Sequence, residues 1–199
     1  MATTHTRVKV QSRNAGFLAT ETLERYHWLE LGEKVLIHET SVLVNMHYIK
    51  CGNHSRIDAF AVVSAGSLID IGNNVHIGSH CSLMGHSKIV LQSFSGLSPG
   101  VRIFSSTDDY SGETMTNPTA EAAFKNVKTA DVLIGRHTIV GAGTIILPGV
   151  TIGEGCAIGA LSLIKDSLEP WGIYAGVPAR RIGERSKALL KLEAKMSVA

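Results

Sequence analysis

The chain has 199 residues, of which 44% are hydrophobic, and its formal net charge at pH 7 is +2. This length allows one sizeable core and argues against two ordinary domains, so we expect a single domain over residues 1–199. The charge is near neutral and no long run of lysine or arginine occurs, which argues against a nucleic-acid partner or a membrane-surface role and favours a small-molecule substrate.

The first residues of the chain, MATTHTRVKVQ, lack the apolar core of a signal peptide, and no apolar stretch approaches the length that spans a membrane. We therefore expect a cytoplasmic protein. The three cysteines, Cys51, Cys81 and Cys156, have no close CxxC spacing. They are expected to be buried small side chains, without a disulfide and without a metal site.

The first 34 residues are expected to flank the main fold. Within them, Thr20 to Leu31 (TETLERYHWLEL) has acidic residues near its start and is followed by Gly32. This pattern predicts a short helix that ends at the glycine and packs at the first coil.

A six-residue repeat dominates the second half of the chain. Its leading aliphatic residues are Ile134, Val140, Ile146, Ile152, Ile158 and Ile164, and the small or apolar residues four positions later are Thr138, Thr144, Val150, Cys156, Ser162 and Leu168. A period of six fits neither the 3.6 residues of an amphipathic helix nor one long alternating strand. It indicates short strands and tight turns, three of which close one triangular coil of a parallel β-helix.

The same repeat is visible earlier in the chain. Its leading residues there are Ile71, Ile77, Leu83 and Ile89, with Val75, Cys81, Ser87 and Ser93 in the small position. We therefore expect β-helix coils over residues 35–105 and 131–168, less regular before residue 65. Glycine after the aliphatic residue suits positions where φ is positive or where coils stack closely.

Two segments break the repeat. Residues 106–130 are polar, contain Asn117-Pro118 and lack periodicity, which predicts an inserted functional loop. Residues 169–199 begin as an extended segment, and Ser186 to Met196 then forms an amphipathic pattern typical of a helix. We expect this helix to cover the open end of the stack, where unpaired strand edges would otherwise be exposed.

The stretch IGRHTIVGAGTIILPGVTIGEGCAIGALSLIKDS, followed by YAGVPARRI, resembles the hexapeptide-repeat acyltransferases. This resemblance covers about residues 35–191. It implies left-handed coils, a homotrimer with active sites between neighbouring subunits, and acetyl-CoA as co-substrate along the C-terminal coils.

The shorter stretches SSTDDYSGE and SLEPWGIYAGVPA are similar to the perosamine N-acetyltransferases of O-antigen pathways. This narrower resemblance implies that acetyl-CoA acetylates the amine of a nucleotide-linked amino sugar, GDP-perosamine or a similar one, in lipopolysaccharide biosynthesis.

For the catalytic base, the resemblance to bacillosamine-type N-acetyltransferases points to His86, with His80 as the second choice. The inserted loop has no histidine, which favours an amine acceptor over a hydroxyl acceptor. A histidine that serves only as a turn residue is the alternative for His86, since His76, His80 and His137 occupy similar turns.

For substrate binding, Asp108, Asp109 and Tyr110 stand where the loop leaves the coils, although a solvated acidic turn is an equal alternative. For acetyl-CoA, the family resemblance implies backbone contacts with pantetheine at small turn residues and positive charge for the phosphates. The turn residues are Gly141, Ala142, Gly159 and Ala160, and the basic residues are Lys165, Arg180 and Arg181.

Three alternative functions are compatible with a repeat of this kind. A γ-type carbonic anhydrase shares the fold, but His76, His80 and His86 do not match the ligand spacing of its zinc site. A purely structural solenoid would lack the inserted loop and the AGVPAR ending. The main alternative is an O-acetyltransferase acting on a sugar or polysaccharide hydroxyl, of the galactoside or maltose type.

Overall fold

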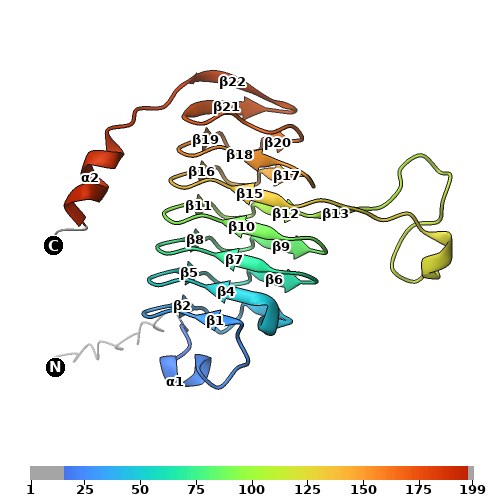
Figure 1. The fold of residues 1–199 in the computed structure, drawn as a ribbon, viewed down its shortest axis with the longest axis horizontal. Helices are drawn as coiled ribbons and strands as arrows, with labels where there is room; N and C mark the ends of the chain where they lie inside the picture. Colours follow the sequence, from blue (N-terminus) through green and yellow to red (C-terminus); the bar gives the residue numbers. More distant parts are fainter. Residues whose placement is uncertain (1–15, 197–199) are drawn as a thin grey trace, which may run out of the picture.

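The computed structural model describes residues 16–196, which wind into a parallel β-helix of stacked triangular coils (Figure 1). The first sheet contains β1 (Glu30–Leu31), β4 (Ile49–Cys51), β7 (Ile69–Ile71), β10 (Ile89–Leu91), β15 (Val132–Ile134) and β18 (Thr151–Ile152). The second contains β2 (Leu36–Ile37), β5 (Arg56–Ile57), β8 (His76–Ile77), β11 (Gly96–Leu97), β16 (Ile139–Val140), β19 (Ala157–Ile158), β21 (Gly172–Gly176) and β22 (Ala179–Glu184). The third contains β3 (Val42–Val44), β6 (Val62–Ala65), β9 (Ser82–Gly85), β12 (Arg102–Phe104), β17 (Ile145–Ile146) and β20 (Leu163–Ile164).

The core is the interior of this triangular stack. The leading aliphatic side chains of the repeat point inward and are almost completely buried, as are Cys51, Cys81 and Cys156. At the corners, buried hydroxyl side chains satisfy backbone carbonyls of the next coil, for example Thr144 Oγ1, which donates to the Gly159 carbonyl at 3.2 Å. The predicted parallel β-helix and the burial of the cysteines are therefore confirmed.

The coils are not all of one length. In the N-terminal part, Lys50 pairs with Asp70 and Ile69 pairs with Ile89, which is 20 residues per coil, whereas Leu133 pairs with Thr151 after 18 residues. The two extra residues lengthen the third-sheet strands and the corner that follows them. A strict six-residue register through this corner was therefore wrong.

The shift changes which residues occupy the repeat positions. Leu91, not Ile89, aligns with Ile71, and the buried residue in the small position is Ser95 rather than Ser93. Ser87 lies in the corner itself. The physical reason is that backbone pairing with the coil below sets the register, and that coil has the same two extra residues.

The predicted helix over residues 20–31 is much shorter. It forms only α1 (Thr20–Leu23), and Trp28 Nε1 donates to the Leu23 carbonyl at 2.9 Å in the bend that follows. Glu30 and Leu31 then extend as β1 and pair with Lys50 and Cys51. The first coil thus begins five residues earlier than expected, because strand pairing satisfies more backbone groups than a solvated helix end would.

The C-terminal helix exists but does not cover the end of the stack. α2 (Leu189–Met196) runs beside the coils, and the hairpin of β21 and β22 forms the end instead (Figure 1). Glu193 of α2 bonds to His137 Nε2 at 2.7 Å and pairs with Arg136, while Arg185 Nη1 donates to the His137 carbonyl at 2.6 Å. These bonds hold the helix at the flank, so the predicted covering role was wrong.

Glycines after the leading aliphatic residue allow close stacking of the coils. A Cβ on Gly135 would lie 2.6 Å from the backbone nitrogen of Glu154, whereas a Cβ on Gly96 would meet nothing within 4 Å. We expect Gly135→Ala to destabilise the fold by about 1–3 kcal/mol, which lowers Tm by roughly 2–4 °C per kcal/mol in a chain of this size. Gly96→Ala is the matched control and should keep or raise Tm; equal melting curves for the two variants would contradict the stacking argument.

Candidate functional site

A groove of about 450 Å³ lies at the corner where the third sheet ends and the first begins. Its lining residues come from three successive coils and from the start of the inserted loop: Asn45, Ser64, Ala65, Gly66, Met84, Gly85, His86 and Ser106. This is the corner that contains the two extra residues per coil. His86 is the sequence-predicted residue that lines it.

His86 is exposed and directly follows β9. Gly66 lets the coil below stack closely under this corner, since a Cβ there would lie 2.7 Å from the Gly85 carbonyl oxygen and 3.3 Å from the His86 Cα. The free space of the groove lies in front of these backbones. The imidazole therefore stands at the surface of the groove with room for a small ligand beside it.

The inserted loop leaves the stack after β12, the strand of the next coil that pairs with β9 (Figure 1). It starts with β13 (Ser106–Thr107) and returns through β14 (Lys128–Thr129), which pair antiparallel, and it contains the short 3-10 helix η2 (Ala122–Phe124). A second short 3-10 helix, η1 (Met46–Tyr48), lies lower in the stack, after β3.

Both ends of the loop are bonded to the corner that carries His86. The buried Ser105 accepts a bond from Ser87 N at 2.9 Å and donates to the Ser87 carbonyl at 2.8 Å. Asp131 accepts from Ser87 Oγ and, at 3.0 Å, from Lys88 N. The bond from Ser87, followed by that from Lys88, holds the pKa of Asp131 below its usual value.

Sequence reasoning missed this attachment of the loop. The residues are 18 and 44 positions apart, and nothing in the six-residue period shows that they meet. The 20-residue coil length of the N-terminal coils would have been the signal for the groove itself, because Ser64 and Met84 are one such coil apart.

The three predicted loop residues have different surroundings. Asp109 accepts bonds from Ser111 N, Ser111 Oγ and both Thr114 donors, at 2.9 to 3.1 Å. The bonds from Ser111 and Thr114 lower the pKa of Asp109 to about 2. Asp109 thus shapes the start of the loop, while Asp108 is half-buried and Tyr110 is 93% exposed.

The predicted cofactor turns lie at a different corner. Gly141-Ala142 and Gly159-Ala160 stand between the second and third sheets, and a Cβ on Gly141 would lie 2.5 Å from Ala160 N. The two turns are therefore stacked with little side chain between the backbone and solvent.

The basic residues divide between the two corners. Arg180 in β22 pairs with Ala175. A Cβ on Gly159 would lie 2.9 Å from the Ala175 Cβ, so Arg180 lies at the corner that contains the turns. Arg181 follows it and bonds to Glu184 at 2.5 Å. Lys165 directly follows β20, as His86 directly follows β9, so both lie at the corner after the third-sheet strands and away from the turns.

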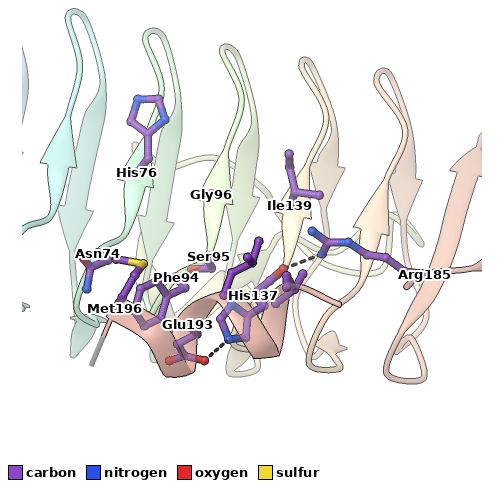
Figure 2. A pocket seen from close by; sticks show the side chains of 12 residues that line it. Asn74, His76, Phe94, Ser95, Gly96, His137, Ile139, Arg185, Glu193 and Met196 are labelled. Atoms are coloured by element: carbon purple, nitrogen blue, oxygen red, sulfur yellow. Dashed lines mark hydrogen bonds and ion pairs between the residues drawn. The ribbon is translucent and has the colours of Figure 1, made fainter. Parts of the chain in front are cut away.

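A further groove of about 390 Å³ lies between α2 and the second sheet. Figure 2 shows Phe94, His137 and Glu193 gathered there, with Arg185 reaching toward His137 from the right of the view. The sequence-predicted site residues do not line this groove. Glu193 and Arg185 both bond to His137 there, which gives the groove a structural role in holding α2.

Comparison with known proteins gives the family. A model described as bacterial transferase hexapeptide (six repeats) matches residues 131–166. The chain is 40% identical over 172 residues, 86% of its own length and 90% of the relative's, to the dTDP-4-amino-4,6-dideoxy-D-glucose acyltransferase of Escherichia coli. The chain belongs to the hexapeptide-repeat acyltransferases. This confirms the sequence-based resemblance and the expectation of a transferase.

Solved structures of an acyltransferase from Bacillus cereus, AntD, have the same fold. With dTDP and 3-hydroxybutyryl-CoA bound, AntD matches at 37% identity and a TM-score of 0.89 over 92% of this chain and 97% of AntD. A variant bound to dTDP-4-amino-4,6-dideoxyglucose and coenzyme A matches at 36% identity and a TM-score of 0.88, over 92% of this chain and 98% of AntD.

Other AntD structures carry substitutions at an aspartate or at a serine ten positions before it.

Within the described residues of this hexapeptide-repeat acyltransferase, no helix has the length and apolar character needed to cross a membrane.

Proposed function

We propose that this hexapeptide-repeat enzyme is an N-acyltransferase that moves an acyl group from a CoA thioester to the amine of a dTDP-linked 4-amino-4,6-dideoxy sugar. The observation that carries the proposal is the 40% identity to a dTDP-4-amino-4,6-dideoxy-D-glucose acyltransferase over nearly the full length of both chains. AntD, which binds CoA and the same sugar nucleotide, supports it.

In the proposed reaction, the sugar amine attacks the thioester carbonyl within a ternary complex. The C–N bond forms and the C–S bond breaks; the departing CoA sulfur takes up one proton and leaves as a thiol, while the attacking neutral amine loses one proton. His86 accepts that proton, as expected of an exposed imidazole beside a groove with room for a ligand. No covalent enzyme intermediate is involved.

Asp108 is the second residue proposed to act on the acceptor. Ser98 and Asp108 are the only serine and aspartate in this chain with the ten-residue spacing of the two positions altered in AntD. A carboxylate at the loop base can bind the ammonium form of the sugar and deliver it toward His86. Asp109 and Tyr110 complete the proposed substrate-binding segment.

The stacked turns are proposed to bind the CoA. Gly141, Ala142, Gly159 and Ala160 leave backbone groups accessible to pantetheine, and Arg180 and Arg181 supply positive charge to the phosphates. Lys165 can contribute only to a CoA phosphate that reaches the opposite edge of the third sheet, in this subunit or in a neighbour.

We propose a homotrimer, and the separation of the two corners supports an active site shared between subunits. His86 comes after a third-sheet strand, whereas the turns come before such strands, so a parallel sheet places them on opposite edges. One chain therefore does not bring base and donor together, and we propose that each active site forms between two subunits, with three sites per trimer.

The decisive experiment is to measure CoA release by the purified full chain with matched acceptors. We expect turnover with dTDP-4-amino-4,6-dideoxyglucose and none with the 4-hydroxy analogue. A GDP-linked 4-amino sugar tests the nucleotide implied by the perosamine resemblance, and acetyl-CoA and 3-hydroxybutyryl-CoA are compared as donors. Turnover of hydroxylated sugars alone would replace the proposal with O-acetylation.

A further inference from the structure

We infer that Met84 selects acceptors whose sugar carries a methyl group in place of a hydroxymethyl group beside the reacting amine. The inference rests on the proposed function. It concerns a part of the substrate that His86 and the loop are not proposed to contact. It arises from the composition of the groove: Met84 is the one exposed, large apolar side chain among its lining residues, beside the polar Asn45, Ser64, His86 and Ser106.

The placement of Met84 follows from strand geometry. Along β9 and the corner after it, Met84 and His86 are exposed while Gly85 between them is buried. Alternate residues of a strand face the same side and are about 6.6 Å apart. The thioether and the imidazole therefore enter the same groove as neighbours, with no side chain between them.

The coil below and the loop above fix the position of Met84. Ser64 is its register partner on β6, and Phe104 is its partner on β12. The backbone is held as well, because Ser105 N donates to the Met84 carbonyl at 3.1 Å. The Met84 side chain is 38% exposed, so a ligand in the groove would cover apolar surface that now faces water.

The chemistry of the acceptor matches this arrangement. In a 4-amino-4,6-dideoxy hexose the amine is on C4 and the methyl group is on C5, the adjacent ring carbon. An acceptor whose amine reaches His86 therefore presents its methyl group close to the same point. Met84 is the neighbouring apolar side chain able to contact it, while Ser64 and Ser106 provide hydroxyl groups at the edges of the groove.

A sugar with a hydroxyl on C6 would place a polar group against the thioether, which is only a weak hydrogen-bond acceptor. An apolar pocket discriminates against one added hydroxyl by a limited factor, and we expect a preference of about 10–100-fold in kcat/KM. Gly66 and Gly85, which line the groove beside Met84, add no side chain that could bond to the extra hydroxyl at this point.

The test compares dTDP-4-amino-4,6-dideoxyglucose with dTDP-4-amino-4-deoxyglucose, which has the C6 hydroxyl, under saturating acyl-CoA. Wild type should prefer the dideoxy sugar. Met84→Gln, of similar length but polar, should reduce the preference about tenfold or more. Met84→Leu should retain it, since the contact stays apolar.

Met196→Gln provides the matched control, because it makes the same change on α2, 64% exposed and outside the groove. It should leave the preference unchanged. Circular dichroism of each variant checks that the coils remain folded. If wild type uses both sugars equally, or if Met84→Gln keeps the full preference, Met84 does not select the acceptor although N-acyl transfer stands. If neither amino sugar is a substrate, the proposed function itself fails and this inference with it.

Discussion

His86→Ala is expected to lower kcat by about 10² to 10⁴ while leaving KM for the acyl-CoA nearly unchanged. The imidazole lies in the proposed acceptor groove, at the opposite edge of the third sheet from the stacked turns, so its loss should affect proton removal more than binding of the donor. Steady-state CoA release with dTDP-4-amino-4,6-dideoxyglucose measures both constants.

His80→Ala is the matched control for this prediction. His80 is also an exposed turn histidine, but it stacks on Phe60 at a ring-centroid distance of 5.1 Å at the corner between the second and third sheets. We expect it to keep most of the wild-type kcat. Full activity of His86→Ala, together with loss of activity in Asp108→Asn, would transfer the role of base to the carboxylate.

Ile103→Ala is expected to destabilise the protein by about 2–5 kcal/mol, the usual cost of removing a large aliphatic side chain from a closed core. Ile103 is fully buried in β12, between its register partners Leu83 and Ile146, directly before the loop leaves the stack. The cavity would open beneath the anchored loop, so activity should fall at temperatures below the melting transition.

Thermal unfolding at one fixed protein concentration tests this, since unfolding of an oligomer depends on concentration. Ile103→Val should cost only about 0.5–1.5 kcal/mol. Ile182→Ala, at a position 67% exposed, should change Tm little. A large loss in the exposed variant or none in Ile103→Ala would contradict the assignment of the inward face.

The six-residue period predicted the coils because each inward side chain is set by local backbone geometry. Ile134 to Ile164 follow it without interruption, and every leading residue there is buried. The period failed at the corner after β9, where two extra residues per coil shift Leu91 into the place expected for Ile89. Such an insertion shows only when one coil is paired with the next, which is a long-range interaction.

The candidate site was predictable only in part for the same reason. Residue type and family resemblance pointed to His86 and to the small turns, but Met84 and Asp131 acquire their places through contacts across coils. The position of α2 was missed because its anchor, Glu193, bonds to residues 56 and 57 positions away. The left-handed coiling was inferred from the family and not from the residues.

The attachment of the inserted loop has a consequence for how such enzymes diversify. Its exit and return points, Ser105 and Asp131, are fastened to the same corner, so the number of residues between them is independent of the coil geometry. Doubling the length of a flexible loop costs only about 0.6 kcal/mol in closure entropy. Insertions, deletions and exchanges of this segment can therefore accumulate while the coils stay as they are, and with the proposed role of the loop such changes would alter which acceptor is recognised.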